Sequence, residues 1–252
     1  MFNNQVKWIR DLLEFVQFAP DPKTYGAMAT TIDDILTAHD KGGGLLSVSD
    51  GSVKHLHNMS FGWVLSTTKG RALAKTYGGC EGRGNSLRAE AYGMLSISTF
   101  IALLAKYSNR TDIKVTYVTD NLELVNRSNE HLKYKHPYPN TTLKSEYDIT
   151  EQIYLTNTMY KITASFVHVY GHQDSKTNRD LTMEEKLNVQ ADKLAGLYQD
   201  DFGAYKPITH MYPSSPAILD INGTTITSNI RNQLQRAYTE PKYMGYLQAK
   251  YK

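Results

Sequence analysis

The pattern of hydrophobic and polar positions changes at a glycine run, Lys41-Gly42-Gly43-Gly44. Before this run, apolar residues recur at helical spacing within residues 5–38, and the prolines at positions 20 and 22 break the pattern. A second, short helix is expected over residues 31–38, with Thr31 as its cap. Because a glycine run is typical of a flexible break, residues 1–43 are predicted to form a helical connector.

Beyond the glycines, the pattern predicts alternating strands and helices. Three consecutive strands are expected at 45–49, 61–66 and 73–77, and the first runs into Asp50. Apolar residues from Leu87 to Ala105 then recur at the spacing of a long helix. The remaining expected elements are a strand at 113–118, a short helix from 122, a polar loop at 131–140, a helix from about 145, a strand at 164–169, a polar loop at 171–184 and a helix at 187–198. This order predicts an α/β domain over residues 44–200, with a mixed five-stranded sheet flanked by helices.

The last part of the chain, residues 201–252, is expected to be a separate extension. Residues 219–226 have Asn222-Gly223 at their centre, which predicts a hairpin. A polar helix is expected from about Thr227, with an interruption at Pro241. Since both elements are polar, the extension is expected to pack on the domain or to lead into a further segment.

Composition excludes several classes of protein. Hydrophobic residues make up 40% and charged residues 21%, as in an ordinary globular chain. The sequence has no run of 18 apolar residues and no signal peptide, so neither a membrane span nor a membrane partner is expected. Cys80 is the only cysteine, so an intrachain disulfide is excluded. The net charge of +3 is compatible with a polyanionic partner without requiring one.

Four carboxylates occupy positions from which they could share one site. Asp50 ends the first predicted strand and Asp120 the fourth, while Glu90 and Asp192 lie early in two helices. The ends of neighbouring strands lie close together, and helices packed on the sheet can reach the same place. Clustered carboxylates repel one another unless cations neutralise them, and hard oxygen ligands suit Mg²⁺ or Mn²⁺. Two such ions about 4 Å apart can activate a water and stabilise the leaving oxygen in phosphodiester hydrolysis.

Five short motifs together carry a family resemblance. They are Ser49-Asp50-Gly51-Ser52, Arg88-Ala89-Glu90-Ala91, Val118-Thr119-Asp120-Asn121, Gly171-His172-Gln173-Asp174 and Asn188-Val189-Gln190-Ala191-Asp192-Lys193-Leu194-Ala195. In this order they resemble the type-1 ribonuclease H family, and most closely the ribonuclease H domains of retroelement reverse transcriptases. The resemblance covers about residues 45–198. It implies a ribonuclease H-like fold and an endoribonuclease that hydrolyses the RNA strand of RNA/DNA hybrids by two-metal-ion catalysis. It also implies a polymerase domain in the same polyprotein and an intracellular place of action, cytoplasmic or nuclear.

The resemblance also implies a role for each site residue. Asp50, Glu90, Asp120 and Asp192 are expected to bind two Mg²⁺ ions, with Mn²⁺ as a substitute and Asp50 as a bridge. His172, in a mobile loop, is expected to assist proton movement near product release, because the charge of histidine can change near neutral pH. RNA is expected to be selected through its 2′-hydroxyls. The residues expected to contact the nucleic acid are Ser49, Gly51, Ser52, Ser86, Arg88 and Asn121.

Other interpretations remain open. An aspartate before a glycine is often only a turn residue, and Glu90 and Asp192 could be solvated helix positions. The sequence also departs from the family: Asn85-Ser86-Leu87-Arg88-Ala89 lacks the asparagine pair of the cellular members, and 20 positions separate His172 from Asp192. The main alternative function is a catalytically silent connector or nucleic-acid-binding module. Two further nucleases fit less well, since a proofreading exonuclease needs Asp-x-Glu on the first strand and an integrase set ends in glutamate.

Overall fold

The computed structural model describes residues 22–54, 58–80, 85–133, 144–200, 220–221 and 224–251; side chains are described outside 22–31, 133, 200, 220–221 and 224–225. The elements along the chain are α2 (Pro22–Gly42), β1 (Leu45–Lys54), β2 (Asn58–Thr67), β3 (Ala72–Gly79), α3 (Ser86–Ser108), β4 (Lys114–Thr119), α4 (Leu122–Lys133), α5 (Tyr147–Met159), β5 (Thr163–His168), α6 (Gln173–Lys176), α7 (Met183–Asp200), β6 (Asp220–Ile221), β7 (Thr224–Thr225) and α8 (Ile230–Lys250).

The first five strands form one mixed sheet in the order β3-β2-β1-β4-β5. β1, β2 and β3 pair antiparallel, as expected for consecutive strands joined by short turns. β4 and β5 join parallel to β1, and helices make the crossovers. This strand order and these directions are those of a ribonuclease H-like sheet, so the predicted fold class is confirmed.

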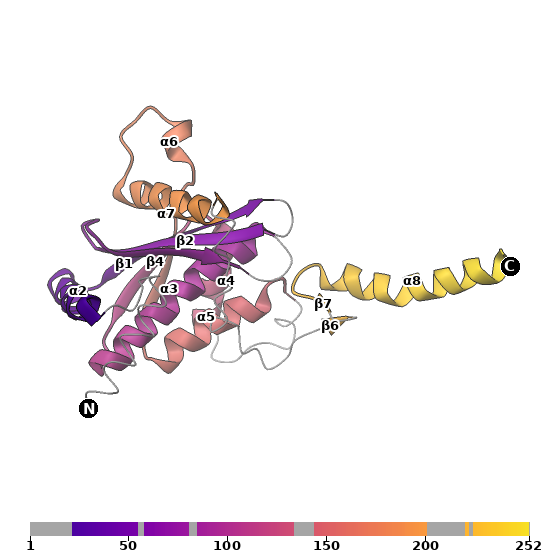
Figure 1. Cartoon of the computed structure of the whole chain (residues 1–252), viewed down its shortest axis with the longest axis horizontal. Coiled ribbons are helices and arrows are strands. Elements are labelled where there is room, and N and C mark those ends of the chain that lie inside the picture. The colour runs from indigo at the N-terminus through magenta and orange to yellow at the C-terminus, as the bar shows by residue number, and fades with distance from the viewer. Residues whose placement is uncertain are drawn as a thin grey trace.

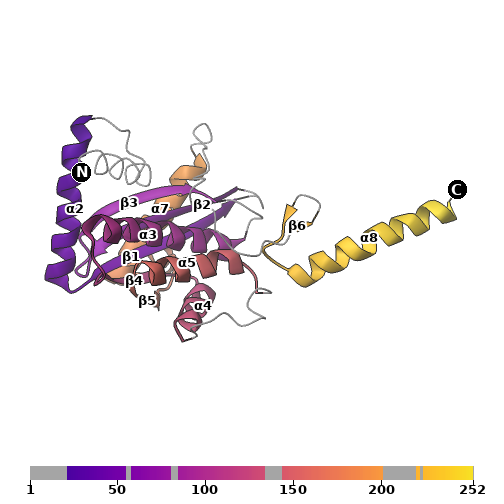
Figure 2. The same ribbon diagram turned by 90° about the horizontal axis from the view of Figure 1, so that it is seen from below.

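Helices cover both faces of the sheet. α3, α4 and α5 lie on one face, and α7 lies on the other (Figure 1). The view in Figure 2 places α2 across one end of the sheet, and Ile32 and Ile35 of α2 are buried in the core. Both faces of β1 are therefore covered, which explains why Leu45, Leu46 and Val48 form an almost continuous apolar run.

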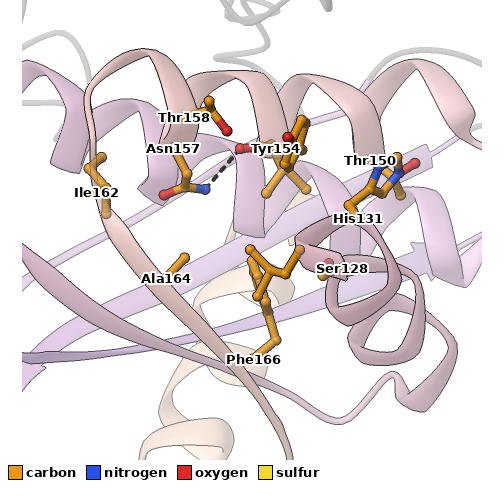
Figure 3. Close-up of a pocket in the computed structure, with 11 residues that line it drawn as sticks. Ser128, His131, Thr150, Tyr154, Asn157, Thr158, Ile162, Ala164 and Phe166 are labelled. Carbon is orange, nitrogen blue, oxygen red and sulfur yellow. Dashed lines mark hydrogen bonds between the residues drawn. The ribbon is translucent and has the colours of Figure 1, made fainter. Parts of the chain in front are cut away.

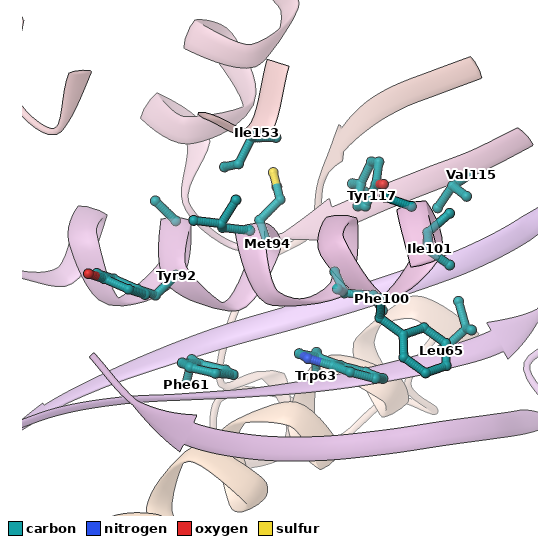
Figure 4. Packing of buried hydrophobic residues seen from close by; sticks show 14 of the residues in the cluster. Phe61, Trp63, Leu65, Tyr92, Met94, Phe100, Ile101, Val115, Tyr117 and Ile153 are labelled. Carbon is teal, nitrogen blue, oxygen red and sulfur yellow. The ribbon is translucent and has the colours of Figure 1, made fainter. Parts of the chain in front are cut away.

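The larger hydrophobic core lies between the sheet and α3. Trp63 of β2 packs against Phe100 of α3, with ring centroids 5.4 Å apart (Figure 4). The indole nitrogen of Trp63 donates a hydrogen bond to Ser96, which satisfies its buried polar atom. α3 is long and apolar enough by composition to cross a membrane, but 83% of its most apolar window is buried inside the protein. α3 is therefore a core helix.

Two glycines allow α3 and α7 to approach the sheet closely. A Cβ on Gly51 would lie 2.4 Å from the backbone nitrogen of Glu90 in α3. A Cβ on Gly62 would lie 2.3 Å from the carbonyl oxygen of Ala191 in α7. Gly51 thus lets Glu90 lie close to β1, and Gly62 lets the middle of α7 lie close to β2.

The single cysteine belongs to the same core. Cys80 follows β3 and is buried, with its backbone N–H bonded to the carbonyl oxygen of Met59. Burial raises the pKa of the Cys80 thiol well above its ordinary value. The thiol is therefore protonated at neutral pH and behaves as a small apolar group.

A small cavity lies between α4, α5 and β5 (Figure 3). Its volume is about 40 Å³, and the rings of His131 and Tyr154 stack at its wall with centroids 5.5 Å apart. A space of this size holds a water molecule or two and no substrate. None of the predicted site residues lines it.

Several elements differ from the sequence predictions in their extent. α2 covers Pro22–Gly42 and not only 31–38, and the helix expected from residue 5 lies largely outside the described residues. A short helix, α6, interrupts the expected polar loop at 171–184. The hairpin strands β6 and β7 pair antiparallel as predicted, although their turn is not described. α8 continues through Pro241, so the predicted interruption is wrong.

Candidate active site

Three of the four predicted carboxylates lie together. Ligand oxygens of Asp50, Glu90 and Asp120 are all within 4.8 Å of one another. The parallel register explains two of them, because the pairing of β1 with β4 ends at Val48 and Val118, and Asp50 and Asp120 each follow two residues later. Glu90 joins them because the close approach at Gly51 presses α3 against β1.

The sequence predicts Asp50 at the end of the first strand, but in the structure Asp50 does not end β1. β1 continues to Lys54, because its antiparallel pairing with β2 extends to Lys54 opposite Asn58. Asp50 therefore lies inside β1, beyond the point where β4 stops pairing with it. This position holds the Asp50 backbone in a regular strand, and a turn role for Asp50 is excluded.

Neighbouring groups orient the two most buried carboxylates. The backbone N–H of Gly51 donates to one oxygen of Asp50 at 2.7 Å, and the amide of Asn188 in α7 donates to the other at 3.4 Å. The hydroxyl of Thr119 donates to Glu90 at 3.0 Å. Thr119 and Asn188 belong to the sequence motifs, but their roles were not foreseen because each depends on an element distant along the chain.

The cluster is unfavourable for negative charge. Burial, followed by the charges of Asp120 and Asp192, raises the pKa of Asp50 from 3.8 to about 7. Burial and the charges of Asp50 and Asp120 raise the pKa of Glu90 well above its ordinary value. An oxygen-only set of carboxylates that repel one another fits a hard divalent cation, which would neutralise them.

Asp192 and His172 lie beside this cluster and not within it. Asp192 is on α7 with 43% of its side chain exposed, and one of its oxygens is 4.0 Å from Nδ1 of His172. The charge of Asp192 still reaches Asp50, whose pKa it raises. His172 is exposed and adopts the left-handed backbone conformation, with φ of 54°, directly before α6. Asp192 and His172 thus form an exposed pair next to three more enclosed carboxylates.

Gly171 leaves room for Asp120. A Cβ on Gly171 would lie 1.9 Å from Oδ2 of Asp120, well inside any allowed contact. Nε2 of His168, at the end of β5, lies 3.0 Å from the backbone carbonyl oxygen of Asp120. The segment after β5 therefore shapes the position of Asp120 from two sides.

The residues predicted to contact nucleic acid are placed very differently. Ser86 is exposed at the start of α3, whereas Ser49 is buried. Gly51, Ser52 and Asn121 are partly buried, and the side-chain oxygen of Asn121 accepts a hydrogen bond from the backbone N–H of Leu124 at the start of α4. The sequence could not separate exposed from enclosed positions within a single motif.

Arg88 departs most from its predicted role. It is buried, and its guanidinium donates to Glu146 at 2.6 Å and to Asp148 at 3.2 Å. Asp148 lies in the first turn of α5, which begins at Tyr147, and accepts a hydrogen bond from Arg88. The ion pairs tie α3 to α5 two residues away from Glu90. Arg88 is therefore placed to hold the structure and not to contact a phosphate.

Comparison with known proteins gave structural similarities only. No family model and no curated protein matched the sequence. Among solved structures, the chain is similar to LC11-RNase H1 in complex with an RNA/DNA hybrid (16% identity, 63% of this chain and 98% of that chain, TM-score 0.47). It is also similar to RNase H1 of the halophilic archaeon Halobacterium salinarum NRC-1 (16% identity, 63% and 99%, TM-score 0.41) and to the PFV RNase H domain (22% identity, 61% and 92%, TM-score 0.42). At these identities and TM-scores, the likeness says nothing about activity.

Proposed function

We propose that this chain is an endoribonuclease that hydrolyses the RNA strand of RNA/DNA hybrids. The observation that carries the proposal is the group formed by Asp50, Glu90 and Asp120, whose oxygens lie within 4.8 Å of one another. Burying acids together raises their pKa values and so costs folding free energy, and nothing in the packing requires three acids at one place. A cation-binding role explains why they are there.

Asp50, Glu90 and Asp120 are the residues that would hold the metal, with Asp192 at the exposed side. Divalent ions, two Mg²⁺ with Mn²⁺ as a substitute, would supply activation of the attacking water and stabilisation of the leaving oxygen. Hydrogen bonds from Gly51 and Asn188 hold the Asp50 carboxylate in one orientation, and Thr119 does the same for Glu90. These contacts reduce the reorganisation that binding would otherwise require.

His172 and Asp192 would handle the proton at the exposed side. The imidazole of His172 is open to solvent, so it can exchange a proton with water. The carboxylate of Asp192 lies 4.0 Å from Nδ1 of His172, on the same exposed side of the cluster. His172 would therefore donate a proton at the leaving oxygen. Its position directly before the short helix α6 would determine how far the imidazole extends toward the carboxylate cluster.

The biological setting follows from the sequence resemblance. In a retroelement reverse transcriptase, a polymerase domain of the same polyprotein would supply the hybrid, and cleavage would take place in the cytoplasm or nucleus. The position of Asp192 outside the three-carboxylate group favours one second candidate, a hybrid-binding module without catalysis.

Cleavage of an end-labelled RNA strand distinguishes the endoribonuclease from the hybrid-binding module. RNA/DNA hybrid, single-stranded RNA and duplex DNA are incubated with the protein and Mg²⁺ or Mn²⁺. We expect cutting of the hybrid alone, lost in Asp50→Asn and Asp120→Asn and retained in Asp112→Asn, an exposed acid of another loop. Hybrid binding without cutting by the folded wild-type protein would identify the silent module.

A further inference from the structure

α8 is an exposed helix anchored at the catalytic end of the domain. None of its residues is buried, and both views show it leading away from the sheet and its helices (Figures 1 and 2). Directly before it, the carbonyl oxygen of Thr227 accepts the backbone N–H of Glu146 at 2.6 Å. Glu146 pairs with Arg88, and Arg88 is two residues from Glu90. The start of α8 is thus tied to the residues that support the carboxylate cluster.

The helix has two chemically distinct faces. With 3.6 residues per turn, one face within about 80° of arc carries Ile230, Leu234, Ala237, Pro241 and Met244. The opposite face, within about 140°, carries every basic residue of the helix together with two tyrosines. We call it the basic-aromatic face after its charged and aromatic residues, which are Arg231, Arg236, Lys242, Tyr243, Tyr246 and Lys250.

Charge is concentrated on this face. Four basic residues and one acid, Glu240, give α8 a net charge of 4 − 1 = +3, equal to that of the whole chain of 252 residues. Glu240 lies outside the arc of the basic residues. Among the described residues, no ion pair involves the four cations, and two of them lie against tyrosine rings instead: Lys242 is 3.9 Å from the ring of Tyr238, and Lys250 is 5.6 Å from that of Tyr246.

We propose that the basic-aromatic face binds the phosphate backbone of the RNA/DNA hybrid outside the cleavage site. The inference rests on the proposed function, which supplies the polyanion at the end of the domain from which α8 projects. A helix of 21 residues is about 32 Å long, the length of about nine base pairs of duplex. Exposed cations at this spacing would release counterions from the phosphates, and tyrosines could contact sugars and terminal bases.

Self-association through the apolar face is the competing use of α8. Its spacing of four and three residues resembles a coiled-coil seam. The seam includes an alanine and a proline, and Gln248 occupies the next position, so it extends over too few turns to hold two copies together. Charge complementarity therefore favours the nucleic acid as the partner.

The test measures binding of a fluorescent hybrid to the full chain by anisotropy, without divalent metal so that no cleavage occurs. The α8 variant replaces the four cations by glutamine (Arg231→Gln, Arg236→Gln, Lys242→Gln and Lys250→Gln). A charge-matched control replaces four exposed cations of the domain (Lys41→Gln, Lys69→Gln, Arg71→Gln and Lys106→Gln). A third protein, with Leu234→Gln and Met244→Gln, alters only the apolar face.

We expect the α8 variant to bind at least tenfold more weakly than wild type, and the charge-matched control to bind within about threefold. The slope of log K against log salt should fall by up to about 3.6 for four lost phosphate contacts. Equal losses in the two charge variants, or no loss in the α8 variant, would overturn the inference. So would a loss confined to the Leu234→Gln, Met244→Gln protein that accompanies a dimer-to-monomer change in light scattering.

Cleavage with Mg²⁺ separates this inference from the proposed function. If wild type cleaves and the α8 variant has an unchanged KM, the function stands and the inference fails. If wild type binds but does not cleave, while the α8 variant still loses affinity, the inference stands and the function fails. A raised KM with unchanged kcat in the α8 variant supports both.

Discussion

Replacing Gly171 by alanine should separate activity from stability. The added Cβ would lie 1.9 Å from Oδ2 of Asp120 and 2.9 Å from its Cγ. Ordinary carbon–oxygen contacts begin near 3.4 Å, so the carboxylate or the loop must move by about 1.5 Å. The φ angle of Gly171 is not positive, so alanine adds no backbone strain there. The steric contact with a candidate metal ligand is the main consequence.

The expected effect on activity is large and the effect on stability small. A displacement of about 1 Å in a catalytic group costs about 10²-fold in rate, equivalent to about 2.7 kcal/mol. Rotating the end of one side chain away from its preferred position costs only about 1 kcal/mol of folding free energy. Gly171→Ala should therefore lose about a hundredfold in kcat/KM for hybrid cleavage while its Tm falls by a few degrees.

The assays are steady-state cleavage, Mg²⁺ titration by calorimetry and thermal unfolding. Gly196→Ala is the matched control, because a Cβ on Gly196 in α7 would meet nothing within 4 Å. Alanine is preferred over glycine inside a helix, so the free energy of unfolding of the control should rise by up to about 1 kcal/mol, with full activity retained. Wild-type kcat/KM and Mg²⁺ affinity in Gly171→Ala would refute the placement of Asp120 as a metal ligand.

Three further predictions concern the packing and the charge of the site. Gly62→Ala should destabilise the protein by about 2–3 kcal/mol in urea unfolding, because its Cβ would meet the α7 backbone, which cannot rotate away; a loss no larger than that of Gly196→Ala would contradict this. Arg88→Met should lower the free energy of unfolding by about 3–5 kcal/mol, and by much less in a Glu146→Gln background. Weaker hybrid binding at unchanged stability would instead support the predicted contact of Arg88 with nucleic acid. Folding raises the pKa of Asp50 from 3.8 to about 7, so between these pH values the folded protein holds a proton that the unfolded chain has lost. The stability of the metal-free protein should therefore fall by at most about 4 kcal/mol as the pH rises through this range. Tm values with EDTA and with Mg²⁺ at pH 5 and pH 8 check this, and a metal-free Tm independent of pH would show that Asp50 is not so perturbed.

The sheet could be predicted from the sequence because its signals are local. Leu45–Val48, Phe61–Leu65 and Lys114–Val118 carry the apolar and β-branched residues of buried strands within a few positions. Their order along the chain then defines the mixed sheet. The end of β1 could not be predicted, because pairing with β2 extends it to Lys54 and pairing is not a local property.

The site residues show the same limit. The motif order marked Asp50, Glu90 and Asp120, and the structure brings them together. The role of Arg88 depends on Glu146, 58 residues away, and no local pattern announces such a partner. An arginine in a motif next to a carboxylate therefore suggested a phosphate contact, although burial gives it acidic partners instead.

Pro241 was expected to end a helix because it lacks an N–H and crowds the carbonyl of the preceding turn. α8 continues through it in an exposed position, where water can satisfy the carbonyl of Ala237. Proline lowers the stability of a helix because one backbone hydrogen bond is lost, and in an exposed helix water can replace part of that bond. The two residues after β7, Ile226 and Thr227, are buried, so the helix also starts from a well-held point.

The enclosed thiol of Cys80 has a practical consequence for spectroscopy. As the only cysteine in the sequence, with a thiol that is buried and protonated at neutral pH, it should react slowly with maleimides in the native state. A second cysteine placed on an exposed surface would then be the preferred labelling position without removal of the native one. A single fluorophore or spin label could thus report on one chosen segment of the otherwise unaltered chain.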